Sequence, residues 1–350
     1  MIYSSSVLNP LEISLSHNQF NFFQSRHCVL LGYSRTCMEY GLHILELDVG
    51  DEVLLPDFIC DVVLSPLNSL GLTPIYYSVN DSLEPRYERI ERQISKKTKA
   101  ILTVNYFGFP QPYDPIRAIC KKHGIWHIED NAQGFLSHKG DQPLGTFGDL
   151  SFTSVRKTLP LKNGAYLCLN HPTLIGRFQS SRYMPYWEKE PCKTFYLKRF
   201  LRWIDMNTFL PLSKFRKEKS IPKPGSGELE QKPFGMDPIA KWLLFHYDLQ
   251  SEIKKRRRNY ALWLQFFLHS PVQPVFDHLP DGVCPFAFPV YVEDQEKWLN
   301  WGWKHGIEIR TWPTLPLWVY HNRPETVERW KRLLLFPLTK SPQNILKRTQ

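Results

Sequence analysis

Residues 97–133 read KTKAILTVNYFGFPQPYDPIRAICKKHGIWHIEDNAQ, and this stretch decides the fold class of the chain. Two short apolar runs, at 100–104 and 125–128, flank a segment at 115–123 whose apolar and charged residues alternate at helical spacing. A strand, a helix and a second strand in this order are typical of a βαβ unit with parallel strands. The stretch therefore predicts an α/β fold.

The same alternation extends to both sides of this stretch, from residue 50 to residue 170. It predicts strands at 52–55, 74–77, 100–104, 125–128, 150–152 and 165–168, and helices at 36–47, 60–70, 83–94 and 115–123. Such a series forms a mixed, mostly parallel sheet that helices cover on both faces. Ligands of these sheets bind at the carboxyl ends of the strands.

Residues 178–232 interrupt this rhythm, because they are rich in aromatic residues, Lys, Arg and Pro and end in a linker-like run. We expect a large domain over 1–177, a basic insert or linker over 178–232, and a smaller α+β C-terminal domain over 233–350. A helical segment at 233–265 is expected to contribute to the large domain. The C-terminal pattern consists of a long helix at 239–268, strands at 286–292 and a helix at 294–305.

One acidic residue and one lysine stand where the expected strands end. Asp130 follows the strand at 125–128, and Lys157 comes shortly after the strand at 150–152. A lysine amine can form a Schiff base with an aldehyde cofactor, and an Asp can keep a pyridinium nitrogen protonated. The pair predicts chemistry with pyridoxal phosphate (PLP). The alternatives are a lysine exposed on a loop and an Asp that caps the next helix.

Several segments in a fixed order carry a family resemblance. They are GDEVLLP at 50–56, GLTPIYY at 71–77, KTKAILTVNYFG at 97–108, HGIWHIEDNAQ at 123–133, GTFGD at 145–149 and RRRNY at 256–260. From about residue 32 to residue 338 the chain resembles the DegT/DnrJ/StrS family of PLP-dependent sugar aminotransferases, as a divergent branch. The resemblance implies the PLP-dependent transferase fold of type I and a homodimer.

The resemblance also implies roles for single residues. Lys157 matches the Schiff-base lysine, and Asp130 matches the carboxylate that pairs with the pyridine nitrogen. Gln133 matches the residue that hydrogen-bonds the phenolic oxygen of the cofactor. In the C-terminal segment, Arg310 is a candidate to hold the carboxylate of the amino donor; a surface arginine is the alternative.

The phosphate of the cofactor needs a helix N-terminus with exposed N–H groups. Ser34, Arg35 and Thr36 align with the phosphate-binding turn of the family, in which Arg35 replaces a glycine. Ser154 is a further phosphate candidate, because the family serine five residues before the lysine is Phe152 here.

Two other departures surround the lysine. Cys60 occupies the position of the aromatic residue that stacks on the cofactor, so Phe58 or another ring is expected to cover it, or none does. After the lysine, the usual Gly-Glu-Gly-Gly stretch reads LKNGA at 161–165.

The resemblance predicts an aminotransferase that moves an amino group from glutamate or glutamine to a keto group. The acceptor is expected to be a nucleotide-activated sugar, in the synthesis of a polysaccharide or surface glycan. A sugar dehydratase is a second interpretation, but related dehydratases carry His in place of the lysine. A third is a non-catalytic binding or regulatory protein, suggested by Arg35, Cys60 and the altered loop after Lys157.

Composition limits the remaining possibilities. The net charge of +10 suits a diphosphate-bearing acceptor, and no motif for reading nucleic-acid grooves accompanies the basic runs. The basic runs are at 198–202, 214–219 and 254–258. The amphipathic segment at 195–204 is expected to pack on the core; contact with a membrane surface is the alternative.

The seven cysteines show no metal-binding spacing, and the N-terminal residues show no signal-peptide pattern. We therefore expect no metal, free thiols and a cytoplasmic protein.

Overall fold

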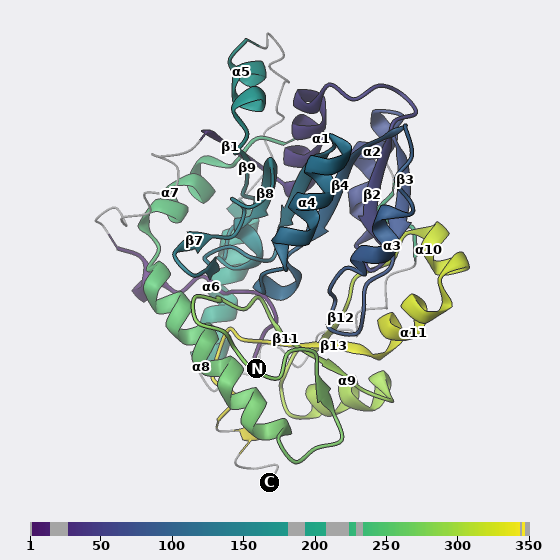
Figure 1. Cartoon of the computed structure of the whole chain (residues 1–350). Helices are drawn as coiled ribbons and strands as arrows, with labels where there is room; N and C mark the ends of the chain where they lie inside the picture. The colour runs from purple at the N-terminus through teal and green to yellow at the C-terminus, as the bar shows by residue number, and fades with distance from the viewer. Residues whose placement is uncertain are drawn as a thin grey trace.

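The computed structural model describes residues 2–14, 27–180, 193–207, 224–228, 234–343 and 345–346. A large sheet with flanking helices fills one half of the molecule, and a small sheet lies beneath it (Figure 1). The long helix α8 (Leu249–Phe267) runs along one side of both parts (Figure 1).

The large sheet confirms the α/β prediction. Its strand order is β1-β9-β8-β5-β4-β2-β3. Strands β3, β2, β4, β5 and β8 are parallel, whereas β9 is antiparallel to both β8 and β1. The strands are β1 (His27–Leu31), β2 (Glu52–Pro56), β3 (Thr73–Tyr77), β4 (Thr98–Val104), β5 (Trp126–Asn131), β8 (Leu150–Ser154) and β9 (Ala165–Leu169).

The helices of this domain are α1 (Ser34–Leu45), α2 (Leu64–Ser69), α3 (Tyr87–Glu91), α4 (Tyr113–His123) and α5 (Pro172–Ser180). Helix α4 ends at Gly124, whose left-handed backbone (φ 65°) returns its N–H to the carbonyl of Cys120. Helix α3 is shorter than the predicted 83–94. Leu83 is left-handed (φ 61°) and Pro85 follows it, so the chain turns before the helix begins.

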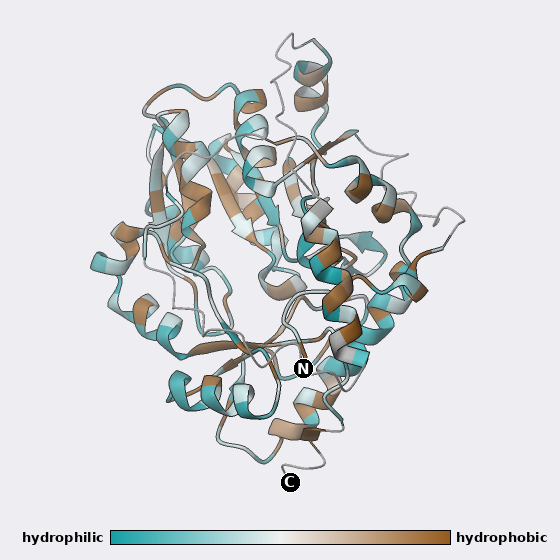
Figure 2. Ribbon diagram, turned by 180° about the vertical axis from the view of Figure 1, so that it is seen from behind, coloured by the Kyte–Doolittle hydropathy of each residue, from teal (hydrophilic) through white to brown (hydrophobic). Residues whose placement is uncertain are grey.

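The C-terminal region confirms the α+β prediction. The small sheet has the order β10-β11-β13-β12, from β10 (Gln273–Pro274), β11 (Phe288–Tyr291), β12 (Arg310–Thr311) and β13 (Leu333–Phe336). Its helices are α9 (Gln295–Lys304), α10 (Leu317–Asn322) and α11 (Pro324–Arg332). The helices around the sheets carry hydrophilic and hydrophobic residues together, as amphipathic helices do (Figure 2).

The long helix predicted at 239–268 is two helices, so that prediction was wrong. Helix α7 (Pro238–His246) ends at Tyr247, which is extended, and α8 begins after Asp248. The side chain of Asp248 accepts the N–H of Ser251, and that of Asp237 caps α7 in the same way. Two strong N-caps within the pattern explain the break.

The insert contains one described helix, α6 (Lys193–Asn207). Tyr196 of α6 is buried in a hydrophobic core cluster, and Arg199 donates to the carbonyl of Ser6 in the N-terminal segment at 2.8 Å. The basic run at 214–219 lies outside the described residues. Among the helices that the structure describes, none has the length and apolar character needed to cross a membrane.

The prediction of free thiols was wrong for two cysteines. Cys28 and Cys168 form a disulfide across β1 and β9. The antiparallel register places them directly opposite each other, with their Cα atoms 4.2 Å apart. Such cross-strand neighbours are close enough to bond without moving the backbone. Cys37, Cys60, Cys120 and Cys284 are free.

Candidate active site

The carboxyl end of the large sheet brings Asp130 and Lys157 together. Asp130 is the penultimate residue of β5, and Lys157 ends the short 3-10 turn (Val155–Lys157) that follows β8. Strands β5 and β8 are parallel neighbours, and Asp130 pairs with Phe152 of β8. The charges of Asp130 and Lys157 influence each other's pKa, so both side chains share one site.

Glu129 explains why the chain turns into this site. Its side chain points to the opposite face of β5 from Asp130, because neighbouring side chains alternate along a strand. There its two carboxylate oxygens accept the N–H groups of Gly145, Phe147 and Gly148. These bonds hold the turn that leads into β8 and therefore to Lys157.

Asp130 is buried, and one of its oxygens is free for a ligand. Its Oδ1 accepts the N–H of Ala132 at 2.9 Å, and no donor among the described residues contacts Oδ2. Burial raises the pKa of Asp130 to about 6, although the charge of Lys157 and the Ala132 N–H oppose the rise. Residues 132–137 form turns, so Asp130 caps no helix.

Lys157 is half-buried, not an exposed loop residue. Burial lowers the pKa of its amine, and Arg156 lowers it further, while Asp130 and Cys60 oppose the change. Its Nζ lies 6.0 Å from the ring centroid of Phe286. A lowered pKa increases the neutral fraction of the amine, which is the form that attacks an aldehyde.

The turn at the start of α1 lies beside the lysine. The N–H of Gly164 donates to the carbonyl of Gly32 at 2.7 Å, and the guanidinium of Arg156 lies 5.1 Å from the ring centroid of Tyr33. The Ser34 hydroxyl is buried and has no hydrogen-bond partner among the residues that the structure describes. An orphan hydroxyl at the N-terminus of a helix fits a phosphate.

The other residues of this turn are less open to a ligand. Thr36 is buried in the first turn of α1. The guanidinium of Arg35 lies 4.3 Å from the ring centroid of Tyr33, which places it over that ring. The two cations, Arg35 and Arg156, therefore share Tyr33 as a neighbour.

Gln133 is buried, and the structure describes a hydrogen bond for one end of its side-chain amide. Its Oε1 accepts the N–H of Phe107 at 2.7 Å. This contact orients the side-chain amide, so its Nε2 group is the end that can donate to a ligand oxygen.

Ser154 ends β8, where it is buried and pairs with Ala165 of β9. Phe152, at the position of the expected family serine, lies in the hydrophobic core. Ser154 is thus the closer of the two to the lysine turn, which it precedes as the N-cap residue.

Phe58 was one of the possible aromatic covers of the cofactor, and the structure packs its ring into the core. Phe58 is fully buried, with its ring centroid 4.9 Å from that of Trp312 and 6.2 Å from that of Tyr106. Cys60 is half-buried near Lys157, and burial raises the pKa of its thiol to about 11. Cys60 is therefore a neutral neighbour of the lysine.

Arg310 lies in β12 with its side chain 38% exposed, and its Nη2 is 3.5 Å from Glu308 Oε1. Burial lowers the pKa of Arg199 to about 10, and the charges of Arg202, Arg310 and Arg156 lower it further. The described contact of the Arg310 guanidinium is thus with Glu308, and its role toward a donor carboxylate stays a prediction.

Sequence reasoning missed Phe286, and it considered Arg256 only as part of a basic run near the site of a dimer partner. The ring of Phe286 faces the amine of Lys157, and Arg256 donates to the carbonyl of Thr158, the next residue along the chain. RRRNY at 256–260 carried part of the family resemblance, but no local pattern indicated that its first arginine reaches the lysine turn.

Comparison with known proteins agrees with this geometry. Residues 14–182 match the DegT/DnrJ/EryC1/StrS aminotransferase family. The chain is 24% identical over 318 residues to GDP-perosamine synthase of Vibrio cholerae, which covers 84% of this chain and 83% of the relative. A second GDP-perosamine synthase, from Escherichia coli O157:H7, is 28% identical over 186 residues, or 50% of this chain and 51% of that protein.

Solved structures share the fold over almost the whole chain. PseC of Helicobacter pylori, an aminotransferase involved in the biosynthesis of pseudoaminic acid, has a TM-score of 0.69 at 17% identity and covers 99% of this chain and 96% of its own. The aminotransferase TlmJ of Streptoalloteichus hindustanus has a TM-score of 0.68 at 16% identity, with coverage of 99% and 96%.

Proposed function

Since the chain belongs to the DegT/DnrJ/EryC1/StrS aminotransferase family, we propose that it moves an amino group from glutamate or glutamine to a keto group of a nucleotide-activated sugar. It is a PLP-dependent enzyme. The observation that carries the proposal is the shared site of Lys157 and Asp130 at the carboxyl ends of β5 and β8. The orphan hydroxyl of Ser34 at a helix N-terminus fits the phosphate.

Each residue has a task in this proposal. PLP, when bound, supplies an electron sink for the charge that develops as the donor loses its Cα proton. Lys157 would hold the cofactor covalently and would move the proton once released, for which its lowered pKa is suited. Asp130 would use its open Oδ2 to keep the ring nitrogen protonated, and Gln133 would donate to the phenolic oxygen. Ser34, Thr36 and Ser154 would bind the phosphate, and Arg310 is the candidate for the donor carboxylate.

The cofactor assignment is tested by reduction. Protein incubated with PLP is treated with borohydride, digested and analysed by mass spectrometry. The reduced cofactor is expected on the peptide that contains Lys157, and Lys157→Ala is expected to remove it. Lys139→Ala is the matched control, because Lys139 donates to the carbonyl of Gln111 away from the site. A Lys157→Ala protein that still carries the adduct would refute the assignment.

The reaction is tested in two halves. Glutamate or glutamine alone is expected to convert the bound cofactor to its amino form, and a keto-sugar is expected to convert it back. GDP-linked keto-sugars come first in the panel, because two relatives are named GDP-perosamine synthase. A protein that loses water from the sugar without consuming a donor is a dehydratase, and one that binds PLP but turns over neither substrate has a binding role.

We also propose a homodimer that works in the cytoplasm, where glutamate and nucleotide-activated sugars are available. Helix α7 supports the dimer, because it exposes two large apolar side chains, Ile239 and Trp242. Exposed apolar patches of this kind mark interfaces, and two-fold dimers are the commonest closed assemblies. Cell fractionation tests the location.

A further inference from the structure

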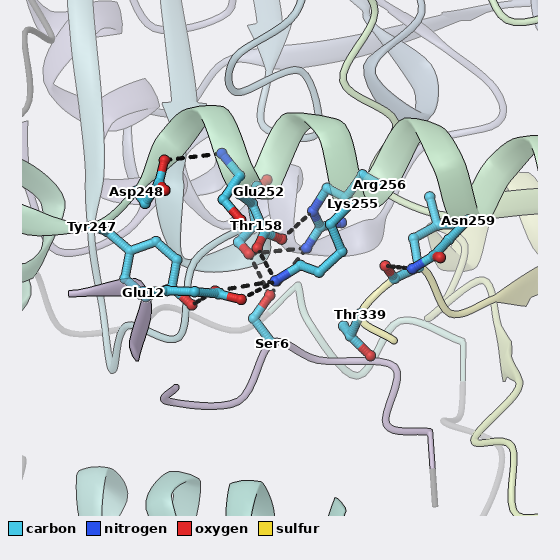
Figure 3. A network of polar contacts seen from close by, with 12 residues as sticks. Ser6, Glu12, Thr158, Tyr247, Asp248, Glu252, Lys255, Arg256, Asn259 and Thr339 are labelled. Carbon is cyan, nitrogen blue, oxygen red and sulfur yellow. Dashed lines mark hydrogen bonds and ion pairs between the residues drawn. The ribbon is translucent and has the colours of Figure 1, made fainter. Parts of the chain in front are cut away.

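A buried polar network joins α8 to the loop that carries the catalytic lysine (Figure 3). At its centre is Arg256, whose side chain is 2% exposed. A buried guanidinium is costly unless its donors find acceptors. The acceptors of Arg256 therefore show which segments depend on it.

Two of its contacts fix the backbone directly after Lys157. Nη2 of Arg256 donates to the carbonyl of Thr158 at 2.9 Å and to the hydroxyl of Ser6 at 3.0 Å. The hydroxyl of Ser6 donates in turn to the same Thr158 carbonyl. The residue after the lysine is thus held from α8 and from the N-terminal segment.

Two further contacts lead to the other side of the amine. Nη1 of Arg256 donates to the carbonyl of Phe286 at 2.9 Å and to that of Pro285 at 3.3 Å. The ring of Phe286 faces Lys157 Nζ at 6.0 Å. The loop of Phe286 and the loop that carries Lys157 are therefore both bonded to the guanidinium of Arg256.

This second branch continues to Gln133. The N–H of Phe286 donates to the carbonyl of Phe107 at 2.8 Å, and the N–H of Phe107 donates to Gln133 Oε1 at 2.7 Å. An unbroken series of hydrogen bonds thus runs from Arg256 to the side chain proposed to bind the phenolic oxygen.

Glu252 fixes the orientation of the guanidinium itself. Arg256 Nε donates to Glu252 Oε1 at 2.6 Å, one turn earlier on α8, and the Glu252 side chain is 1% exposed. Burial alone would raise the pKa of Glu252, but the charges of Arg256 and Lys255 hold it below its ordinary value. The carboxylate is ionised, and it holds the fork of Arg256 toward the lysine loop (Figure 3).

We propose that Arg256, oriented by Glu252, is a positioning residue that sets where the Lys157 amine and the Gln133 amide lie. It touches neither the cofactor nor the substrate; it acts through Thr158 and Phe286. The cofactor part of this inference rests on the proposed function, whereas the effect on the Lys157 amine does not.

The test compares Arg256→Lys and Glu252→Gln with variants of the next arginine. Arg257 donates to the carbonyls of Pro280 and Val283, at 2.8 and 2.7 Å, and has no contact with Thr158 or Phe286. Arg257→Lys therefore loses backbone contacts of the same kind without touching the lysine loop. Arg256→Met is the severe variant, and the other two keep the test informative if it fails to fold.

The first readout uses the cofactor-free protein. Acetic anhydride labelling of Lys157 is measured against pH by mass spectrometry, with Lys139 as the internal reference. Arg256→Lys and Glu252→Gln are expected to change the labelling rate of Lys157 about tenfold, because a displacement of about 1 Å at an active site has effects of this size or larger. Arg257→Lys is expected to leave that rate unchanged.

The second readout uses the loaded protein. The Kd of PLP is expected to rise about tenfold in Arg256→Lys, and kcat to fall at nearly constant KM for the donor. If the Arg256 and Arg257 variants lose equal thermal stability while Lys157 labelling and the PLP Kd stay at wild-type values, Arg256 is only structural and the inference is wrong. If wild-type protein binds no PLP, the proposed function fails, and the labelling experiment still decides the role of Arg256.

Discussion

At the scale of single residues, the site is built from two groups that burial makes reluctant to ionise. Burial raises the pKa of Asp130 and lowers that of Lys157, and each charge partly restores the other. Such opposed shifts of neighbouring groups are frequent at catalytic sites. A cationic cofactor ring next to Asp130 would favour its ionised form, so the cofactor and the carboxylate stabilise each other.

Asp130→Asn is expected to raise the stability of the cofactor-free protein and to lower its affinity for PLP. The folded-state pKa of Asp130 is raised from 3.8 to about 6. Between these two pH values the folded state keeps a proton that the unfolded state has released. The free energy of unfolding therefore falls as the pH rises from 3.8 to about 6. At pH 7.5 the variant should gain roughly 3 kcal/mol in free energy of unfolding.

Urea unfolding at pH 7.5 and pH 4 measures this effect, since the gain should almost vanish at the lower pH. PLP affinity of the same variant should fall at least about tenfold, because one unit of pKa interaction corresponds to a factor of ten. An equal change of stability at both pH values would contradict the assignment of the shift.

The sequence was sufficient to predict some residues of the candidate site but not others. Asp130 and Lys157 could be predicted because each follows an apolar run that forms a strand, and Gln133 because of the family resemblance; their roles stay predictions. Phe286 and Arg256 could not, because their link to Lys157 runs through carbonyl groups of distant segments. The burial of Phe58 was also hidden, since it depends on packing against Trp312 in the C-terminal region.

At the scale of elements, β1 and β9 form a unit that joins the two halves of the site. Strand β1 leads into the turn at Ser34, where we propose that the phosphate binds, and β9 leaves the lysine loop at Gly164. Strand β1 was not predicted, although residues 28–31 form a short apolar run like those of the other buried strands. It pairs with β9, more than 130 residues later in the chain.

Reduction of Cys28–Cys168 is expected to lower the free energy of unfolding by about 3 kcal/mol, because the bond closes a long loop in the unfolded chain. The two cysteines are 140 residues apart in sequence. Cys28→Ser should show the same loss without reductant, and reductant should have little further effect on it.

Thiol titration of the denatured, unreduced protein checks the bond directly. Seven cysteines less the two in the disulfide leave at most five reactive thiols. Seven thiols in protein purified without reductant would show that the pair is reduced in the cell, as expected for most cytoplasmic proteins.

At the scale of the whole molecule, the parallel core was predictable and its assembly with the C-terminal region was not. All six predicted strands of the large domain exist: five are parallel, and they and the antiparallel β9 have the apolar runs of buried strands. The small sheet was only partly identified: β12 has two residues, and β13 follows α11 without a turn signal. The short elements are fixed by pairing with each other, which no local pattern encodes.

The homodimer is testable at this scale. Light scattering is expected to give twice the chain mass of 41.3 kDa. Trp242→Glu places a charge on the apolar face of α7 and should shift the protein toward the monomer. Trp303→Glu on α9 is the matched control, because both tryptophans are 44% exposed. A monomer in the wild type, or equal dissociation of both variants, would contradict the proposed interface.

The N-terminal segment has a consequence for the timing of biosynthesis. Residues 2–6 are synthesised before the segments that hold them: Ile2 pairs with Gly306 and Glu308, and the carbonyl of Tyr3 accepts a hydrogen bond from the hydroxyl of Thr339. Contacts so distant in sequence form late in folding. We therefore expect Ser6 to be anchored beside Thr158 only once the C-terminal region is in place. The loop that carries Lys157 thus reaches its final geometry together with that region.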